Sequence, residues 1–451
     1  MESIMTRLWI ANPLAVFAEN AEGGIVIEDG RIKSLVQRGD RPPHDEIFDA
    51  SAHVVIPGLI NTHHHMYQTL TRAMTGAYSH ELFDWLKALY PIWAGLTPEM
   101  VSAASELAMA ELLLSGCTTT TDHHYVFPSG HEDAIDRQVE AATCLGIRVI
   151  LTRGCMSLSE DDGGLPPASV CQSEEHILND CERLISAYHD PNPFAMTQIA
   201  FAPCSPFSVT TQLMRDAVTL AKRHRILLHT HLAETEDENQ FCLDTFGARP
   251  LAYVGECGWL DVPAWYAHGV HFAADEWQLL AAAKAGVASC SCSNMYLASG
   301  ICPVCEMENA GVAIGLGVDG SASNDGSNMI QEVRQAMLLQ RLRYGAARVS
   351  WADALRWGTA GSAAVLHRPE LGRLAPNLAA DLALFKLDEL QFSGAQDPLA
   401  ALIICGAHRA DRVMVNGRWR VIAGDLVQFD LDRARRTHQQ LARTLQTAIH
   451  S

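Results

Sequence analysis

The feature that most constrains the fold is a repeated alternation of helical and strand-like segments between residues 58 and 367. Thr97-Pro98-Glu99 is typical of a helix start, with a capping hydroxyl, a proline in the first turn and an acidic residue near the helix N-terminus. Gly116 ends this helix, and a threonine-rich strand is expected at 118–121. Comparable strands are expected at 148–151, 226–229 and 312–316. Because repeated βα units build a parallel sheet, this stretch predicts an α/β fold with a (β/α)8 TIM-like barrel.

Both ends of the chain show the turn residues of antiparallel β structure. An Asp29-Gly30 turn separates two strand-like runs within 25–32, and an Asn416-Gly417 turn does the same within 413–421. A further short strand is expected at 381–385. We therefore predict a small β-sandwich domain built from residues 1–57 and 368–428, a barrel at 58–367 and a polar, helical tail at 429–451.

The charge balance limits the class of partner. The 451 residues include 52 acidic and 33 basic side chains, which gives a net charge of −19 without a basic run. Nucleic acids and anionic membranes attract clustered lysine and arginine, so we expect neither as a partner. No apolar run approaches the length that crosses a bilayer. The expected partner is a small molecule.

The cysteines indicate a reducing compartment. Thirteen are scattered along the chain, and the N-terminus has no secretory leader pattern, so we expect free thiols in the cytoplasm. The spacings Cys290-x-Cys292 and Cys302-x2-Cys305 invite a structural zinc site. We expect buried free thiols at these positions instead.

A His-x-His pair follows the apolar run Pro57-Gly58-Leu59-Ile60-Asn61-Thr62. Side chains two positions apart on a strand point to the same face, so His63 and His65 should converge while His64 points away. Two imidazoles at one strand end supply half of a metal site. The remaining ligands must come from elsewhere in the chain.

Three later motifs each fall where a strand should end: His231 after the strand at 226–229, His268 within Ala-His-Gly, and Asp319 within Gly-Val-Asp-Gly-Ser. The carboxyl ends of barrel strands form the active-site mouth. Alone, each residue is more often a core histidine or a turn aspartate. Together with His63 and His65, however, His231 and Asp319 can hold one divalent ion and leave a position for water.

The Pro-Gly-Leu-Ile-Asn-Thr-His-His-His, His-Leu-Ala-Glu-Thr and Gly-Val-Asp-Gly blocks resemble the amidohydrolase superfamily, and most of all its mononuclear deaminase and chlorohydrolase branch. The resemblance covers nearly the whole chain. It implies one divalent metal bound by His63, His65, His231 and Asp319, with zinc expected and iron(II) as the alternative. It also implies a homo-oligomer, because relatives often form dimers or larger assemblies.

The resemblance further implies proton-transfer roles for Glu234 and His268 beside Asp319. A metal ion lowers the pKa of a bound water toward neutrality. Asp319 would accept the water proton, His268 would hydrogen-bond the adduct, and Glu234 would protonate a ring nitrogen and then the departing amine. The plain alternative for Glu234 is a surface salt bridge.

Substrate contacts are assigned to three residues. The Gln68 amide offers a donor and an acceptor to a purine edge, against plain packing as the alternative. Arg153 ends a predicted strand and would meet a carbonyl oxygen or form a structural ion pair. Cys204 stands where many relatives have His or Arg, so it should alter which ring edge is recognised. His123 and His124 are candidates for the cavity wall, or pack near a strand end.

The motif pattern as a whole resembles deaminases of this superfamily that act on oxidised purines. This resemblance implies a hydrolytic deaminase that converts 8-oxoguanine and water to urate and ammonia by attack at C2. Guanine, isocytosine and amino- or chloro-s-triazines remain alternatives that share the mechanism. A non-catalytic scaffold with the same fold is a further alternative. It is disfavoured because the chain retains every expected metal ligand and both proton-transfer residues.

Overall fold

The computed structural model describes residues 7–128, 130–324 and 326–447. Eight parallel strands close into a barrel in the order β10-β11-β12-β13-β14-β15-β7-β9. They are β7 (Leu59–Asn61), β9 (Cys117–His124), β10 (Arg148–Cys155), β11 (Thr197–Pro203), β12 (Leu228–Leu232), β13 (Ala264–His268), β14 (Gly286–Ser289) and β15 (Ala313–Leu316). The predicted fold class, a (β/α)8 barrel joined to a β-sheet domain, is confirmed.

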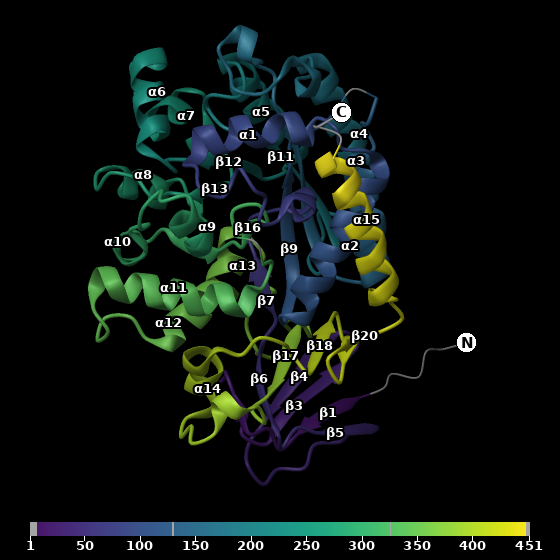
Figure 1. Ribbon diagram of the computed structural model, residues 1–451. Helices are drawn as coiled ribbons and strands as arrows, with labels where there is room; N and C mark the ends of the chain where they lie inside the picture. Colours follow the sequence, from purple (N-terminus) through teal and green to yellow (C-terminus); the bar gives the residue numbers. More distant parts are fainter. Residues whose placement is uncertain (1–6, 129, 325, 448–451) are drawn as a thin grey trace.

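Helices surround the barrel (Figure 1). The longer ones are α2 (Pro98–Leu114), α3 (Ala134–Leu145), α4 (Glu174–Tyr188), α5 (Thr211–His224), α6 (Glu236–Phe246) and α11 (Met329–Tyr344). The shorter ones are α7 (Pro250–Glu256), α8 (Glu276–Ala282), α9 (Ser291–Tyr296), α10 (Val304–Asn309), α12 (Trp351–Arg356) and α13 (Ser362–Val365). A further helix, α1 (Leu82–Trp93), lies across the barrel mouth.

The first barrel helix follows its sequence signals closely. The Thr97 side chain accepts a hydrogen bond from the backbone N–H of Met100, and Pro98 begins α2. Gly116 adopts φ +91°, a left-handed conformation that suits glycine. A Cβ at Gly116 would also lie 2.8 Å from the ring of Phe385, so the helix-to-strand turn packs directly on the β-sheet domain.

Two strand boundaries differ from those expected. The strand predicted at 226–229 is β12, which begins at Leu228 and includes His231, because its pairing with β13 aligns His231 with Ala267. The strand expected through His63 and His65 is interrupted. Thr62 directs both its N–H and its hydroxyl to the carbonyl of Leu316, and pairing resumes only at β8 (His64–His65).

The two chain ends supply strands to two packed sheets. One contains β1 (Leu8–Ala11), β3 (Gly24–Glu28), β4 (Arg31–Val36) and β5 (Glu46–Asp49). The other contains β2 (Ala15–Val16), β6 (His53–Pro57), β17 (Leu382–Lys386), β18 (Arg412–Val415), β19 (Arg418–Ile422) and β20 (Asp425–Leu426). A buried apolar cluster shared by both sheets includes Ile10, Ile27 and Leu384. Both predicted hairpins are present, as β3–β4 and β18–β19.

The helical tail packs back against the barrel. Helix α15 (Leu431–Thr447) lies along α2 and the short helix η1 (Met66–Thr71). His438 Nε2 is 3.0 Å from the hydroxyl of Thr69, and the Gln446 amide donates to the carbonyl of Leu70 at 2.7 Å. The chain's last described helix therefore holds a segment that directly follows His65. Residues 1–6 of the predicted β domain and 448–451 of the predicted tail lie outside the described residues.

In the described part of the chain, no helix combines the length and the apolar character needed to cross a membrane.

Candidate active site

Four side chains from three separated parts of the chain meet at the barrel mouth. His63 follows β7, His65 ends β8 and His231 lies on β12, while Asp319 begins the two-residue strand β16 (Asp319–Gly320). Strands β8 and β16 pair in parallel at the centre of the site. Although the predicted strand is broken, the rings of His63 and His65 still converge, with centroids 4.7 Å apart.

Backbone carbonyls determine which nitrogen of two imidazoles faces the centre. His65 Nδ1 donates to the carbonyl of His123 at 2.7 Å, and His231 Nδ1 donates to the carbonyl of Cys204 at 2.6 Å. A neutral imidazole carries one proton, so in both rings Nε2 is left with a lone pair. These two Nε2 atoms are 3.1 Å apart.

His63 is oriented in the same way through a second histidine. His229 Nδ1 donates to the carbonyl of Trp265 at 2.9 Å, so His229 Nε2 accepts from His63 Nδ1 at 2.8 Å. The remaining nitrogen, His63 Nε2, is buried and has no hydrogen-bond partner in the described residues. Fixing the outer nitrogen in this manner is how proteins orient metal-binding histidines.

The donor atoms fit a metal ion. One carboxylate oxygen of Asp319 lies 3.3 Å from His63 Nε2 and 3.2 Å from His65 Nε2. Ligands held at about 2.0–2.2 Å from a common ion lie about 3.0–3.5 Å apart. Three lone pairs and a carboxylate oxygen at such separations repel one another unless a cation lies between them. Burial lowers the pKa of His63 well below its usual value and that of His231 to about 3, so both stay neutral, as a metal requires.

Glu234 and His268 lie beside these atoms. His268 Nε2 is 3.5 Å from Glu234 Oε2 and 3.8 Å from Asp319 Oδ2, and its Nδ1 is 3.0 Å from Asn294 Oδ1. Burial, and secondarily the charge of Asp319, raises the pKa of Glu234 well above its usual value. Glu234 can therefore carry a proton near neutral pH. Its side chain is buried, which excludes the surface salt bridge as its environment.

Backbone strain accompanies these positions. Ala233, His268 and Asp319 have φ values of +54°, +72° and +61°, in the left-handed region that non-glycine residues seldom adopt. The N–H of Glu234 donates to the buried carboxyl of Glu238 at 2.8 Å, which holds the strained turn before α6. Such strain persists where the surrounding structure determines the conformation, as at functional sites.

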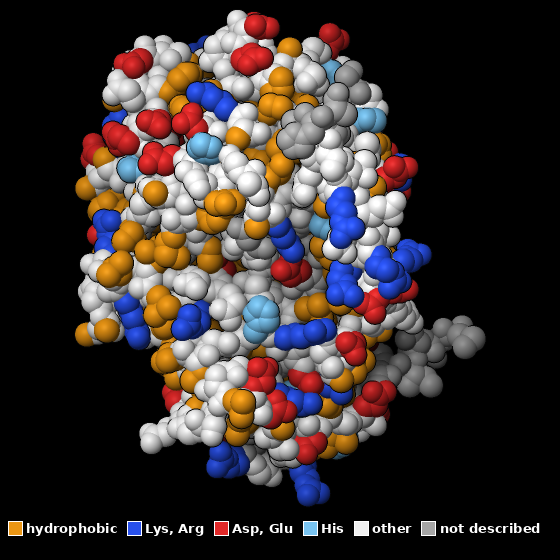
Figure 2. Space-filling view, viewed as in Figure 1, with side chains coloured by type: hydrophobic (Ala, Val, Ile, Leu, Met, Phe, Trp, Pro, Cys, Tyr) orange, Lys and Arg blue, Asp and Glu red, His pale blue; other side chains and the backbone are white. Residues whose placement is uncertain are grey.

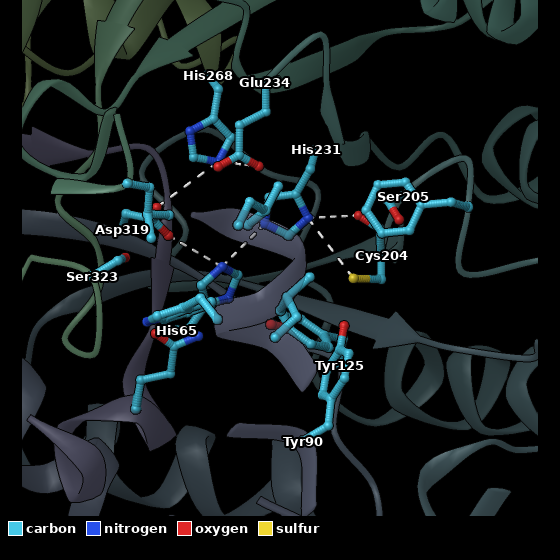
Figure 3. Close-up of a pocket in the computed structure, with 16 residues that line it drawn as sticks. His65, Tyr90, Tyr125, Cys204, Ser205, His231, Glu234, His268, Asp319 and Ser323 are labelled. Carbon is cyan, nitrogen blue, oxygen red and sulfur yellow. Dashed lines mark hydrogen bonds and ion pairs between the residues drawn. The ribbon is translucent and has the colours of Figure 1, made fainter. Parts of the chain in front are cut away.

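A cavity opens beside the cluster (Figure 3). One side carries the polar residues described above, and Tyr125 and Ser205 add further polar atoms. The apolar wall comes largely from α1 and consists of Leu82, Trp85, Leu86, Tyr90, Phe207 and Leu297. Apolar and aromatic walls with a few directed polar groups suit a heteroaromatic ligand.

Gln68 lines this cavity from η1. Its Oε1 accepts a long hydrogen bond from the backbone of Ala322 at 3.4 Å, whereas its buried Nε2 has no partner within the described residues. The amide packs against Gly320, where a Cβ would lie 1.8 Å from Gln68 Oε1. The Tyr67 hydroxyl is the polar group near this amide, so the structure leaves a weakly satisfied donor on the cavity wall next to Asp319.

Cys204 also lines the cavity, at the end of β11. Burial raises the pKa of its thiol to about 12, so it stays protonated. The Cys204 carbonyl orients His231, as described above, while the side chain faces the space beside it (Figure 3). Cys204 therefore orients His231 through its carbonyl and lines the cavity through its side chain.

Arg153 does not line the cavity, so the substrate contact expected for it is not what the structure shows. Its guanidinium pairs with Asp180 of α4 at 2.5 Å and donates to Gln172 at 2.8 Å. It also stacks over the ring of Phe127 at 3.7 Å. The arginine side chain is fully buried, and these contacts use its charge and its hydrogen bonds, so the alternative of a structural ion pair holds.

The model of the amidohydrolase family matches residues 54–420, which include the whole barrel and strands of the β-sheet domain. The chain belongs to the amidohydrolase family.

Relatives of this amidohydrolase include deaminases and a chlorohydrolase. The chain is 57% identical over 446 residues to 8-oxoguanine deaminase of Pseudomonas aeruginosa, covering 98% of this chain and 99% of the relative. It is 36% identical over 405 residues to an isoxanthopterin deaminase of an unknown prokaryotic organism, covering 86% and 84%. The zinc complex of atrazine chlorohydrolase from Arthrobacter aurescens TC1 superposes with a TM-score of 0.90 at 29% identity, covering 96% and 100%.

In this amidohydrolase, His123 and His124 lie behind the site rather than in the cavity wall. The His123 ring stacks on His231 with centroids 4.8 Å apart, and its Nε2 is 3.0 Å from the carbonyl of Ala202. The His124 ring packs edge-on against Phe127 at 4.9 Å. All thirteen cysteines are free, as predicted, including the four in the C-x-C and C-x2-C spacings.

Two groups of site residues escaped the sequence reasoning. Asn294, which orients His268, lies on α9, in a segment whose cysteines alone were considered from the sequence. The apolar wall from α1 lies in the Trp-rich segment at 85–93, whose aromatic content was a usable signal without an assigned role. Both depend on contacts between distant parts of the chain.

Proposed function

We propose that this amidohydrolase is a hydrolytic deaminase of an oxidised purine, converting 8-oxoguanine and water to urate and ammonia. The observation that carries the proposal is the 57% identity to an 8-oxoguanine deaminase along nearly the whole length of both chains. The buried histidine and aspartate cluster, with Glu234 and His268 beside a largely apolar cavity, supplies the groups that the reaction needs. A small heterocycle is the partner in this proposal.

His63, His65, His231 and Asp319 would hold one divalent ion, which we propose to be zinc, with iron(II) as the alternative. Three imidazoles and one carboxylate are a donor set suited to either ion. Zinc is favoured by its presence in the structurally similar atrazine chlorohydrolase. When bound, the ion would lower the pKa of a water molecule toward neutrality and supply the nucleophile.

The residues around the cluster handle the protons. Asp319 Oδ2 faces His268 and is placed to accept a proton from the attacking water. Glu234, protonated because its pKa is raised, donates to a ring nitrogen next to the attacked carbon. It then takes the hydroxyl proton of the adduct and passes it to the amine, so the C–N bond breaks, ammonia leaves and the carbonyl forms. The proton held by Asp319 restores Glu234 for the next turnover. His268, oriented by Asn294, hydrogen-bonds the oxygen that joins the ring.

The cavity residues orient the ring. The Gln68 amide would hydrogen-bond the ring edge near Asp319, and Cys204 would shape another part of the cavity, since both residues line it. Tyr125 and the α1 side chains pack on the ring faces and keep water out. A homo-oligomeric, cytoplasmic protein remains the prediction from the sequence.

Purified protein tests the proposal directly. Incubation with 8-oxoguanine should release urate and ammonia in equal amounts, followed by the absorbance of urate and a coupled ammonia assay. Guanine, isocytosine and amino- or chloro-s-triazines form the comparison panel. Fast turnover of a triazine with no turnover of 8-oxoguanine would overturn the substrate assignment. Purification without stoichiometric metal and without activity on any ring would instead favour a scaffold.

A further inference from the structure

Two buried hydrogen-bonding groups on the cavity wall make no well-formed hydrogen bond within the described residues. One is the Gln68 amide Nε2, and the other is the hydroxyl of Tyr90. Tyr90 is 1% exposed, so water from the surface does not satisfy its hydroxyl. Buried polar groups are nearly always paired, and an unpaired one that lines a ligand cavity calls for a partner on the ligand.

The two groups stand at different ends of the cavity. Gln68 packs against Gly320 next to Asp319. Tyr90 comes from α1, and in Figure 3 it lies with Cys204 at the end of the drawn residues away from Asp319 and His268. The Cys204 thiol is within reach of a hydrogen bond with the Tyr90 hydroxyl, but a thiol is a weak hydrogen-bonding group and leaves the hydroxyl without a strong partner.

The hydroxyl is fixed as a donor. Burial raises the pKa of Tyr90 well above its usual value, so the group keeps its proton in the working range. The ring is also held rigidly, with Trp93 packed edge-on at 5.8 Å from it. A ligand that places an acceptor at this end of the cavity would therefore gain a well-placed hydrogen bond.

The proposed substrate supplies that acceptor. When the amine-bearing carbon of a purine faces the histidine and aspartate cluster, the five-membered ring projects away from that cluster. Position 8 of this ring carries a carbonyl oxygen in 8-oxoguanine and only a hydrogen in guanine. Guanine would thus leave the Tyr90 hydroxyl unpaired, and a site built to hydrogen-bond a group discriminates against an analogue that lacks it.

We propose that Tyr90 is a specificity-determining residue whose hydroxyl donates a hydrogen bond to the oxygen on the five-membered ring of an oxidised purine. This inference rests on the proposed function and extends it. In this arrangement Gln68 hydrogen-bonds the six-membered ring near the histidine and aspartate cluster. Tyr90 hydrogen-bonds the oxygen at position 8 of the five-membered ring. Selection between oxidised and unoxidised purines then resides in one hydroxyl on α1.

The test is Tyr90→Phe, which removes the hydroxyl and keeps the ring. The matched control is Tyr266→Phe, because the Tyr266 hydroxyl is likewise buried and unpaired in the described residues but lies on β13 outside the cavity. Both variants are assayed with 8-oxoguanine, guanine and isocytosine, which retains the attacked ring and lacks the five-membered one. For a ring that is not turned over, its inhibition constant against 8-oxoguanine is measured.

For Tyr90→Phe, we expect kcat/KM on 8-oxoguanine to fall about ten- to hundredfold, the effect of losing one buried hydrogen bond. The values for guanine and isocytosine should change less than about threefold, and Tyr266→Phe should match the wild type on all three. Equal losses on all rings, or no loss on 8-oxoguanine, would overturn the role of Tyr90. Failure of the proposed function is seen separately, as absent turnover of 8-oxoguanine by the wild-type protein.

Discussion

The contact between Gly320 and Gln68 allows a test of the substrate hydrogen bond proposed for Gln68. A Cβ at Gly320 would lie 1.8 Å from Gln68 Oε1 and 2.3 Å from its amide carbon, whereas ordinary contacts begin near 3.4 Å. Gly320 does not have a left-handed φ, so Gly320→Ala adds no backbone strain. The whole effect should come from displacing a fully buried amide.

The magnitude follows from that overlap. Overpacking of this kind costs about 1–3 kcal/mol of folding free energy. The displaced amide loses its hydrogen bond to the ring, about 0.5–1.5 kcal/mol, so kcat/KM on the substrate should fall about two- to tenfold. Metal content should stay at the wild-type level, because the ligand atoms of Asp319 and the histidines are not in the collision.

The assay is a double-mutant cycle with Gln68→Ala, followed by ammonia release, urea denaturation and metal analysis. In the Gln68→Ala background the added methyl group has space, so Gly320→Ala should cost little further activity. Gly326→Ala is the control, since a Cβ there meets no atom within 4 Å. Strictly additive losses in the double variant would refute the reasoning, because the damage would then not pass through Gln68.

Three further predictions concern the metal, the proton transfer and the tail. His63→Ala should purify without stoichiometric metal and without activity, and retained turnover would contradict the site. Glu234→Gln should keep its metal while kcat falls about 10²–10⁴-fold, and a wild-type rate would place the proton transfer elsewhere. For His438, burial lowers the pKa to about 4, below the unfolded value near 6.5, so the folded state loses stability as the pH falls between these values. Wild-type protein should therefore lose about 3 kcal/mol more than His438→Gln between pH 7 and pH 4 in urea titrations, and parallel curves would exclude this role.

The parts of the site that could be predicted are those encoded by local spacing. His63 and His65 are two residues apart, and their rings converge even though the strand between them is interrupted. His231 and Asp319 could be placed because each lies near the carboxyl end of a barrel strand. Position at a strand end is a property of the local sequence once the barrel is recognised.

The parts that could not be predicted depend on long-range packing. Arg153 also lies near a strand end, yet its partner Asp180 comes from the following helix, so its side chain is used for structure. Asn294 acts only through His268, 26 positions away. Tyr90 lines the cavity because α1 crosses the barrel mouth. The local sequence of α1 does not predict that position.

The hydrogen bonds between α15 and η1 support substrate selection without supporting metal binding. Thr69 and His438 are 369 positions apart, and neither His63, His65, His231 nor Asp319 contacts α15 through the bonds that hold it. A chain truncated after residue 430 would keep every ligand for the ion and lose the support behind Gln68. Such a fragment should still bind the metal ion, but its selectivity between heterocyclic substrates should be lower.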